Sequence, residues 1–499
     1  MTSTTSSLAN AESSRNHTVT LWTLVALIIG STVGSGIFSL PQNIASVAGP
    51  GAMLIGWLIA GVGMLSVAFV FQYLAHRKPH LDSGVYSYAR AGLGDFIGFT
   101  AGWGYWIGSV IAQVGYATLF FNTVGHYVPL FDADHRWASA IAVSVMSWAI
   151  FAVLARGIKQ AAVMNMVTSI AKIVPILAFM VFIAFLGFSW DKFTFDFWGE
   201  DSGSTVFEQI QGIMLYTVWV FIGVEGASVY SKQARSRNDV GRATVIGFFS
   251  VLALLVSVST LSFGVLSQAE LAALPDNSMA SVLEAVVGPW GAAFISIGLC
   301  LSVLGAYVSW QMLCAEPIVM MAIDGLLPRK IGTINVAGAP WVAQFISTAV
   351  IQVFIIVFFL NETSYNAMVQ LATIMYLLPY IFTSLYLLLL GIRGKGLSHP
   401  HAGVKFDLSG PEISKRENRR HIVIGAIAFV YSLWLIYAAD LVYVLLGVLA
   451  VIPGLIPYVG TRLYKKERVF NAFEWCVVAI VFIGAIAAIW GLSTGSLAL

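Results

Sequence analysis

The stretch Gly30-Ser31-Thr32-Val33-Gly34-Ser35-Gly36-Ile37-Phe38 places three glycines within seven residues, in the middle of an apolar run over residues 21–46. Glycine loosens a helix because it has no side chain and the largest backbone freedom. The run is long enough to cross a bilayer, which takes about 20 apolar residues. The stretch therefore predicts a membrane-spanning helix that is interrupted near its midpoint.

A second interrupted helix is predicted over residues 207–230. It contains Phe221-Ile222-Gly223-Val224-Glu225-Gly226-Ala227-Ser228, where two glycines bracket a carboxylate that is costly to place in lipid. The two interruptions lie five predicted spans apart, and because five is odd, the two helices enter the bilayer from opposite faces. Paired interrupted helices are typical of inverted-repeat transporters, whose substrate site lies at the midplane. Close helix packing through small residues is the alternative explanation.

The composition places nearly the whole chain in lipid. Of 499 residues, 58% are hydrophobic and 10% are charged, whereas soluble domains carry roughly 25% charged residues. Apolar spans are predicted at residues 21–46, 51–75, 97–129, 137–155, 160–188, 207–230, 241–267, 288–323, 340–360, 365–391, 421–438, 441–461 and 470–492. We predict an all-α integral membrane protein of about 13 helices, or 12 if the eleventh and twelfth spans form a re-entrant pair.

These spans divide the chain into four parts. Residues 1–20 form a polar tail, and residues 21–391 form a ten-helix transport core, an inverted repeat of five plus five helices. Residues 392–420 form a loop, and residues 421–499 hold the C-terminal helices. The purpose of these last helices is open between homodimer contacts and lipid packing.

The basic residues predict the orientation. With the N-terminus in the cytoplasm, all of the 26 Lys and Arg residues except Arg136, Lys172 and Lys192 fall in cytoplasmic segments. Cytoplasmic loops of membrane proteins carry such an excess. We therefore predict a multi-pass protein of a bacterial cytoplasmic membrane with its N-terminal tail in the cytoplasm.

Several function classes are not indicated. Cys300, Cys314 and Cys476 show no paired spacing, so neither a disulfide framework nor a metal site is predicted, and no cofactor is implied. The eight histidines fall in the tail, loops or helix ends, which disfavours a membrane-embedded enzyme. No filter-like loop or charged ring indicates a channel. A net charge of +2 gives no reason to expect nucleic acid.

The interrupted helices favour an amino acid as the ligand. Unpaired N–H groups at a half-helix N-terminus attract a carboxylate, and freed carbonyls accept from an ammonium. Glu225 is an acid at mid-membrane depth and is predicted to serve an ion or substrate pathway, with a helix-bridging role as the alternative. Lys172 is the only basic residue in the interior of a predicted helix; the alternative to a functional role is that its ammonium snorkels to the membrane surface.

Three motifs resemble the amino acid-polyamine-organocation superfamily. They are Gly34-Ser35-Gly36-Ile37-Phe38-Ser39-Leu40-Pro41, Trp219-Val220-Phe221-Ile222-Gly223-Val224-Glu225 and Asp324-Gly325-Leu326-Leu327-Pro328. Within it the chain is similar to the basic amino acid/polyamine antiporters, particularly arginine/ornithine antiporters and bacterial lysine permeases. The resemblance implies alternating-access transport of lysine, arginine or ornithine, by exchange or by a proton- or potential-driven permease. Neutral or acidic amino acids or polyamines are the alternative substrates, because the broken helices are shared.

The resemblance also implies roles for residues near the two interruptions. The substrate carboxylate would bind at Val33, Gly34, Ser35 and Gly36. The α-amino group would bind the backbone of Trp219 and Ile222, with the Trp219 ring closing over it. Glu225 would touch the substrate or sense protons.

Other implied site residues lie in the third, fifth and eighth spans. Tyr105 and Trp310 match aromatic gate positions, and aromatic faces attract a guanidinium or ammonium. Gln113 stands where relatives often carry asparagine, and Tyr116 lies on the same helical face. Lys172 would occupy the place of a sodium ion, bridging the first and eighth spans, so that transport would couple to protons through Lys172 and Glu225.

Overall fold

The computed structural model describes residues 20–78, 80–81, 84–156, 161–224, 237–361, 363–393, 413–495 and 497. Within these ranges every regular element is a helix, as the composition predicts. Glu225 and most of the predicted tail and loop lie outside the described residues, and the four-part division of the chain stays a prediction.

Ten helices in the described ranges are long and apolar enough to cross a membrane. They are α4 (Pro50–Arg77), α6 (Asp95–Gly125), α7 (Arg136–Ala155), α12 (Arg237–Phe263), α15 (Pro289–Ile323), α16 (Trp341–Leu360), α17 (Tyr365–Arg393), α18 (Lys415–Ala438), α19 (Leu441–Tyr464) and α20 (Ala472–Ser493). An eleventh span consists of α2 (Leu21–Thr32) and α3 (Gly36–Ala45), bent by 53°.

The remaining two predicted spans correspond to two further helices. One is α8 (Ala161–Phe182), which continues into a π-helical turn, and the other is α10 (Val206–Trp219), which leads toward undescribed residues. The lengths of α18 and α19 favour two separate spans over the re-entrant alternative, because each helix has 24 residues. At 1.5 Å per residue each is about 36 Å long, which is enough to span the bilayer.

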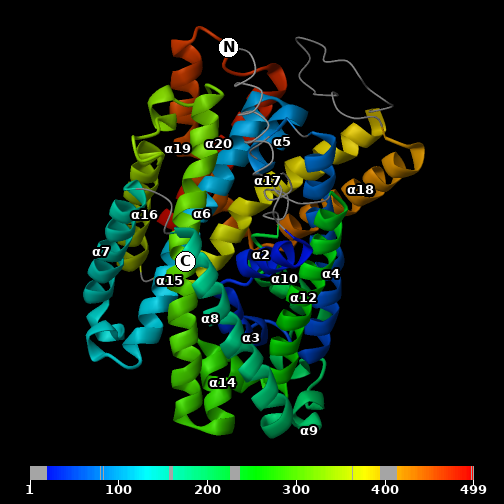
Figure 1. The fold of residues 1–499 in the computed structure, drawn as a ribbon, viewed down its shortest axis with the longest axis vertical. Coiled ribbons are helices and arrows are strands. Elements are labelled where there is room, and N and C mark those ends of the chain that lie inside the picture. Colours follow the sequence, from blue (N-terminus) through cyan, green and yellow to red (C-terminus); the bar gives the residue numbers. More distant parts are fainter. Residues whose placement is uncertain are drawn as a thin grey trace, which may run out of the picture.

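The order of elements repeats along the chain with opposite orientation. A short helix, α5 (Gly84–Leu93), lies between the second and third spans, and α13 (Gln268–Ala272) and α14 (Ser278–Val287) lie between the seventh and eighth. Figure 1 shows α5 near the top of the molecule and α14 near the bottom, beside α9 (Trp190–Thr194). These two faces are called the α5 end and the α14 end. Their placement agrees with the predicted inverted repeat.

The centre of the bundle is formed by α6, α15 and α17. The helix α6 packs against both α15 and α17, and most of the apolar length of each of the three is buried. The helices α7 and α20 bury much less and lie at the periphery. The C-terminal helices join the bundle through α18, which packs against α17 and α4, and through α19, which packs against α17 and α6. A homodimer through these helices stays a prediction.

Candidate functional site

The two predicted interruptions lie against each other. The Ser31 hydroxyl near the end of α2 donates a hydrogen bond to the carbonyl oxygen of Gly223 over 3.3 Å. Gly223 follows α10 and adopts a φ of +106°, and a Cβ atom there would lie 2.6 Å from the Ser31 carbonyl oxygen. Both the positive φ and the close approach require glycine. Two segments 192 residues apart in sequence therefore meet at their breaks.

At the first interruption, one helix ends and the next begins within a single membrane span. The helix α2 ends at Thr32, Val33 is extended, and α3 begins at Gly36. The first N–H groups of α3 have no partner within the helix, as at any helix start, and they carry partial positive charge. Val33 and Ser35 are buried and Gly34 is half-buried. The arrangement can hold a carboxylate, as predicted from the sequence.

Trp219 covers the start of α3. A Cβ atom at Gly36 would lie 2.6 Å from Nε1 of the Trp219 ring, so the indole rests directly on this glycine. Trp219 is the last residue of α10, and Ile222 lies buried in the turn that follows. The Trp219 carbonyl accepts from the N–H of Ile222 over 3.3 Å and keeps a second lone pair for another donor.

Tyr116 brings α6 to the same place. Its hydroxyl lies 3.3 Å from the position of a Cβ atom on Gly34, and its ring centroid is 5.7 Å from that of Trp219. The structure thus brings together the predicted residues of three spans around the interruption: Val33, Gly34, Ser35, Gly36, Tyr116, Trp219 and Ile222.

A separate aromatic cluster contains the other two predicted gate residues. The Tyr105 ring centroid is 6.5 Å from Trp310 and 5.0 Å from Tyr376, and Tyr376 lies 6.2 Å from Trp310. Tyr105 is 11 residues before Tyr116 on α6, or about 16 Å along the helix. The cluster therefore lies between the interruption and the α5 end.

Gln113 lies between the two aromatic groups and faces α15. Its buried side-chain amide donates to the backbone carbonyl of Tyr307 over 3.1 Å. The other end of this amide, Oε1, is buried without a hydrogen-bond partner among the described residues. Gln113 thus joins α6 to α15 and keeps one acceptor.

Lys172 connects α8 to the interrupted first span. Its ammonium is buried and donates a hydrogen bond to the carbonyl oxygen of Gly30, two residues before the end of α2. The side chain therefore does not snorkel toward a helix end. The contact agrees with the predicted position beside the first span.

Two residues of the site, both tyrosines, could not be recognised as site residues from the sequence. Tyr365, at the start of α17, receives a hydrogen bond of 3.4 Å from Ser39, whose hydroxyl also donates to the Gly36 carbonyl. Tyr376 completes the second aromatic cluster and shares a 2.8 Å hydrogen bond with Ser109. Single tyrosines in apolar helices form no recognisable pattern, so sequence reasoning missed both.

A cavity of about 600 Å³ opens on the α14 side of the interruption. Tyr365 and Thr118 line it together with α7, α14, α15 and α16. Asp276, one of its acids, accepts a 2.9 Å hydrogen bond from Asn122, and burial raises the pKa of its carboxyl group. The cavity therefore lies between the predicted binding residues and the α14 end.

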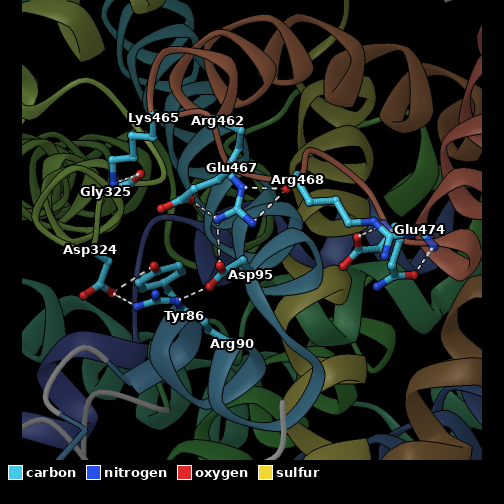
Figure 2. A network of polar contacts seen from close by, with 11 residues as sticks. Tyr86, Arg90, Asp95, Asp324, Gly325, Arg462, Lys465, Glu467, Arg468 and Glu474 are labelled. Carbon is cyan, nitrogen blue, oxygen red and sulfur yellow. Dashed lines mark hydrogen bonds and ion pairs between the residues drawn. The ribbon is translucent and has the colours of Figure 1, made fainter. Parts of the chain in front are cut away.

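The α5 end is instead crossed by polar contacts, shown in Figure 2 and here called the α5-end network. Arg90 pairs with Asp95 over 2.8 Å and with Asp324 over 2.7 Å. Arg462 at the end of α19 pairs with Asp95 over 3.0 Å. Lys465 donates to the carbonyl of Gly325 over 2.8 Å, and Tyr86 donates to Asp324 over 2.9 Å. The third sequence motif, 324–328, is thus part of this closure.

Comparisons with known proteins agree with this architecture. The sequence model of the family described as "Amino acid permease" matches residues 19–482. An L-lysine transport protein of Corynebacterium glutamicum is 69% identical over 97% of this chain and 97% of that protein. An arginine/ornithine antiporter of Pseudomonas aeruginosa is 45% identical over 96% and 98%. An arginine/agmatine antiporter of Chlamydia pneumoniae is 34% identical over 95% and 96%.

These matches confirm the family predicted from the three motifs. The relatives are named as transport proteins, in agreement with the prediction that the chain is not an enzyme. Because the family model and the relatives cover nearly the whole chain, this multi-pass membrane protein belongs to the amino acid permease family.

Proposed function

We propose that the chain is a secondary transporter that carries cationic amino acids across the bacterial cytoplasmic membrane by alternating access. Lysine is the first substrate to test, because the relative at 69% identity is an L-lysine transport protein. The observation that carries the proposal is the contact of the two interrupted spans at Ser31 and Gly223 beneath Trp219. At this contact the ends of the interrupted helices carry partial charges. These partial charges can bind the carboxylate and the ammonium of an α-amino acid.

The proposed binding mode uses the residues around this contact. The carboxylate binds at the start of α3, formed by Val33, Gly34, Ser35 and Gly36. The α-ammonium binds the carbonyls around Trp219 and Ile222, and the Trp219 ring closes over it. Tyr116 packs on the Trp219 ring and bounds the site from α6.

The cationic end of the substrate would pass toward the second aromatic cluster. The ring faces of Tyr105 and Trp310 attract ammonium and guanidinium groups by about 0.5–2 kcal/mol each. Gln113 lies between the two groups with a free acceptor. This path supports a cationic substrate, whereas the backbone of the interruption alone would accept any α-amino acid.

The proposed coupling ion is the proton. The Lys172 ammonium donates a hydrogen bond to the Gly30 carbonyl oxygen beside the interruption. A metal ion at this place would need such oxygens as ligands, and the ammonium competes with it for this one. Glu225, which lies outside the described residues, is the second proposed protonation site. The α5 end carries Arg90, Arg462 and Lys465, and such an excess of basic residues supports a cytoplasmic position for this end.

The test is uptake of radiolabelled lysine, arginine and ornithine into proteoliposomes that contain the purified protein. Empty vesicles, vesicles preloaded with each amino acid, and vesicles with an imposed potential or pH gradient are compared. Uptake that requires preloading identifies an exchanger, and concentrative uptake into empty vesicles identifies a driven permease. Uptake of only neutral or acidic amino acids would contradict the proposed substrate class. Sodium gradients serve as the control for proton coupling.

A further inference from the structure

A small polar pocket lies at the α5 end, outside the proposed transport path. Its volume is about 260 Å³, and it lies where the end of α4 meets the start of α18, which pack side by side (Figure 1). Six residues line it: Tyr73, Ser414, Arg416, Glu417, Arg420 and His421. The Tyr73 and His421 rings pack together with centroids 4.4 Å apart, which fixes the inner wall.

The pocket has an excess of positive charge. Arg416 and Arg420 line it from successive turns of α18, against a single acid, Glu417. Arg77 lies one turn beyond Tyr73 on α4 and interacts electrostatically with both His421 and Glu417. Two guanidinium groups therefore line the pocket with one carboxylate, and a third, that of Arg77, interacts with this carboxylate from α4. The start of α18 adds the partial positive charge of a helix N-terminus.

Two buried groups at the pocket lack hydrogen-bond partners among the residues that the structure describes. His421 is 1% exposed and its Nδ1 atom has no partner, and Arg77 is 7% exposed with an unpaired Nη1 atom. A buried polar atom without a hydrogen-bond partner is unfavourable, so such atoms in proteins are normally paired. An anion bound in the pocket would accept hydrogen bonds from Arg416 and Arg420, which line it, and from His421 when Nδ1 carries a proton.

We propose that this pocket binds the phosphate headgroup of an anionic membrane phospholipid. A phosphate offers several acceptor oxygens and suits an arginine cluster at a helix start. A lipid is the proposed source, because α4 and α18 both cross the membrane and the pocket lies at their ends, where headgroups lie. Basic pockets between spans on the cytoplasmic side bind anionic headgroups in other membrane proteins.

The experiment measures the melting temperature of the full-length protein in a neutral detergent. Phosphatidylglycerol, phosphatidylcholine or inorganic phosphate is added in increasing amounts. The test variant R416Q/R420Q removes two charges that line the pocket, and the matched control K415Q/R419Q removes two exposed charges from the same turns that do not line it. Because all four side chains are exposed, both variants should fold, and gel filtration verifies this.

We expect phosphatidylglycerol to raise the melting temperature of the wild type and of K415Q/R419Q, and phosphatidylcholine to have little effect. R416Q/R420Q should bind phosphatidylglycerol about tenfold or more weakly, because two charge-assisted contacts are lost. Equal weakening in both variants would reveal general electrostatic attraction and overturn the site. An equal response to inorganic phosphate would overturn the lipid as its source.

Discussion

Gly223 is a residue at which the backbones of the two interrupted spans contact each other. Its φ of +106° and the 2.6 Å from its Cβ position to the Ser31 carbonyl leave no space for a methyl group. A Cβ atom at Gly36 would instead meet the Trp219 ring, and a side chain can shift more easily than backbone. The residue-scale requirement for glycine is therefore stricter at Gly223, where the obstacle is backbone.

Gly223→Ala should lower lysine uptake about tenfold or more. The substitution forces a strained backbone, at a cost of roughly 1–3 kcal/mol, or moves α2 away from the turn. Initial uptake rates and melting temperatures of the purified variant measure both effects. Gly460→Ala in α19 is the control, since nothing lies within 4 Å of its Cβ position. Uptake by Gly223→Ala within twofold of the wild type would contradict the proposed role of the contact.

Lys172→Met should abolish the response of uptake to a pH gradient while it leaves some exchange. The variant keeps the apolar length of the side chain but removes the hydrogen bond to Gly30 and the group that can exchange a proton. Uptake with and without a proton gradient provides the measurement. Lys192→Met is the matched control, because Lys192 donates to the Val265 carbonyl over 2.6 Å away from the interruption. Full retention of the gradient response in Lys172→Met would rule out coupling through this lysine.

At the scale of elements, the α5-end network ties the C-terminal helices to the transport core. Arg462 and Lys465 extend from the end of α19 to the first residue of α6 and to Gly325, just beyond α15. Arg90 joins α5 to the same two places. These contacts connect α19 to the transport core, and we predict that they help to close the α5 end. Alternating access requires them to break when this end opens.

R462Q/K465Q should make α5 and the end of α15 open more readily. Hydrogen exchange of residues 84–93 is expected to become about two- to fivefold faster, since partly exposed ion pairs contribute roughly 0.5–1 kcal/mol. E467Q is the control, because Glu467 pairs with Arg462 within the α19 end and reaches no other helix. If both variants exchange at the same rate in this segment, α19 does not hold the α5 end closed.

At the scale of the whole molecule, much of the fold could be predicted because lipid imposes long apolar runs and glycine marks the breaks. Gly34, Gly36 and Gly223 identified both interruptions, and the odd spacing of their spans indicated that they enter the bilayer from opposite faces. The short helices α5 and α14 were not predicted, because amphipathic segments of about ten residues resemble loops in a hydropathy pattern.

Partners across the bundle were harder to predict than positions along it. Tyr105 and Trp310 were expected at the binding site, and the structure places them in a cluster with Tyr376 nearer the α5 end. Asp95 and Arg462 are 367 residues apart, and nothing in their local sequence indicates that they pair. Such contacts depend on the tilt and rotation of packed helices, which a single sequence does not encode in any short pattern.

The α5-end network makes one end of the protein sensitive to salt. Its ion pairs are partly exposed, and mobile salt weakens such pairs, whereas the contact between Ser31 and Gly223 lies inside the bundle. Raising the salt concentration on the side of the α5 end would therefore weaken this network and leave the contact between Ser31 and Gly223 intact.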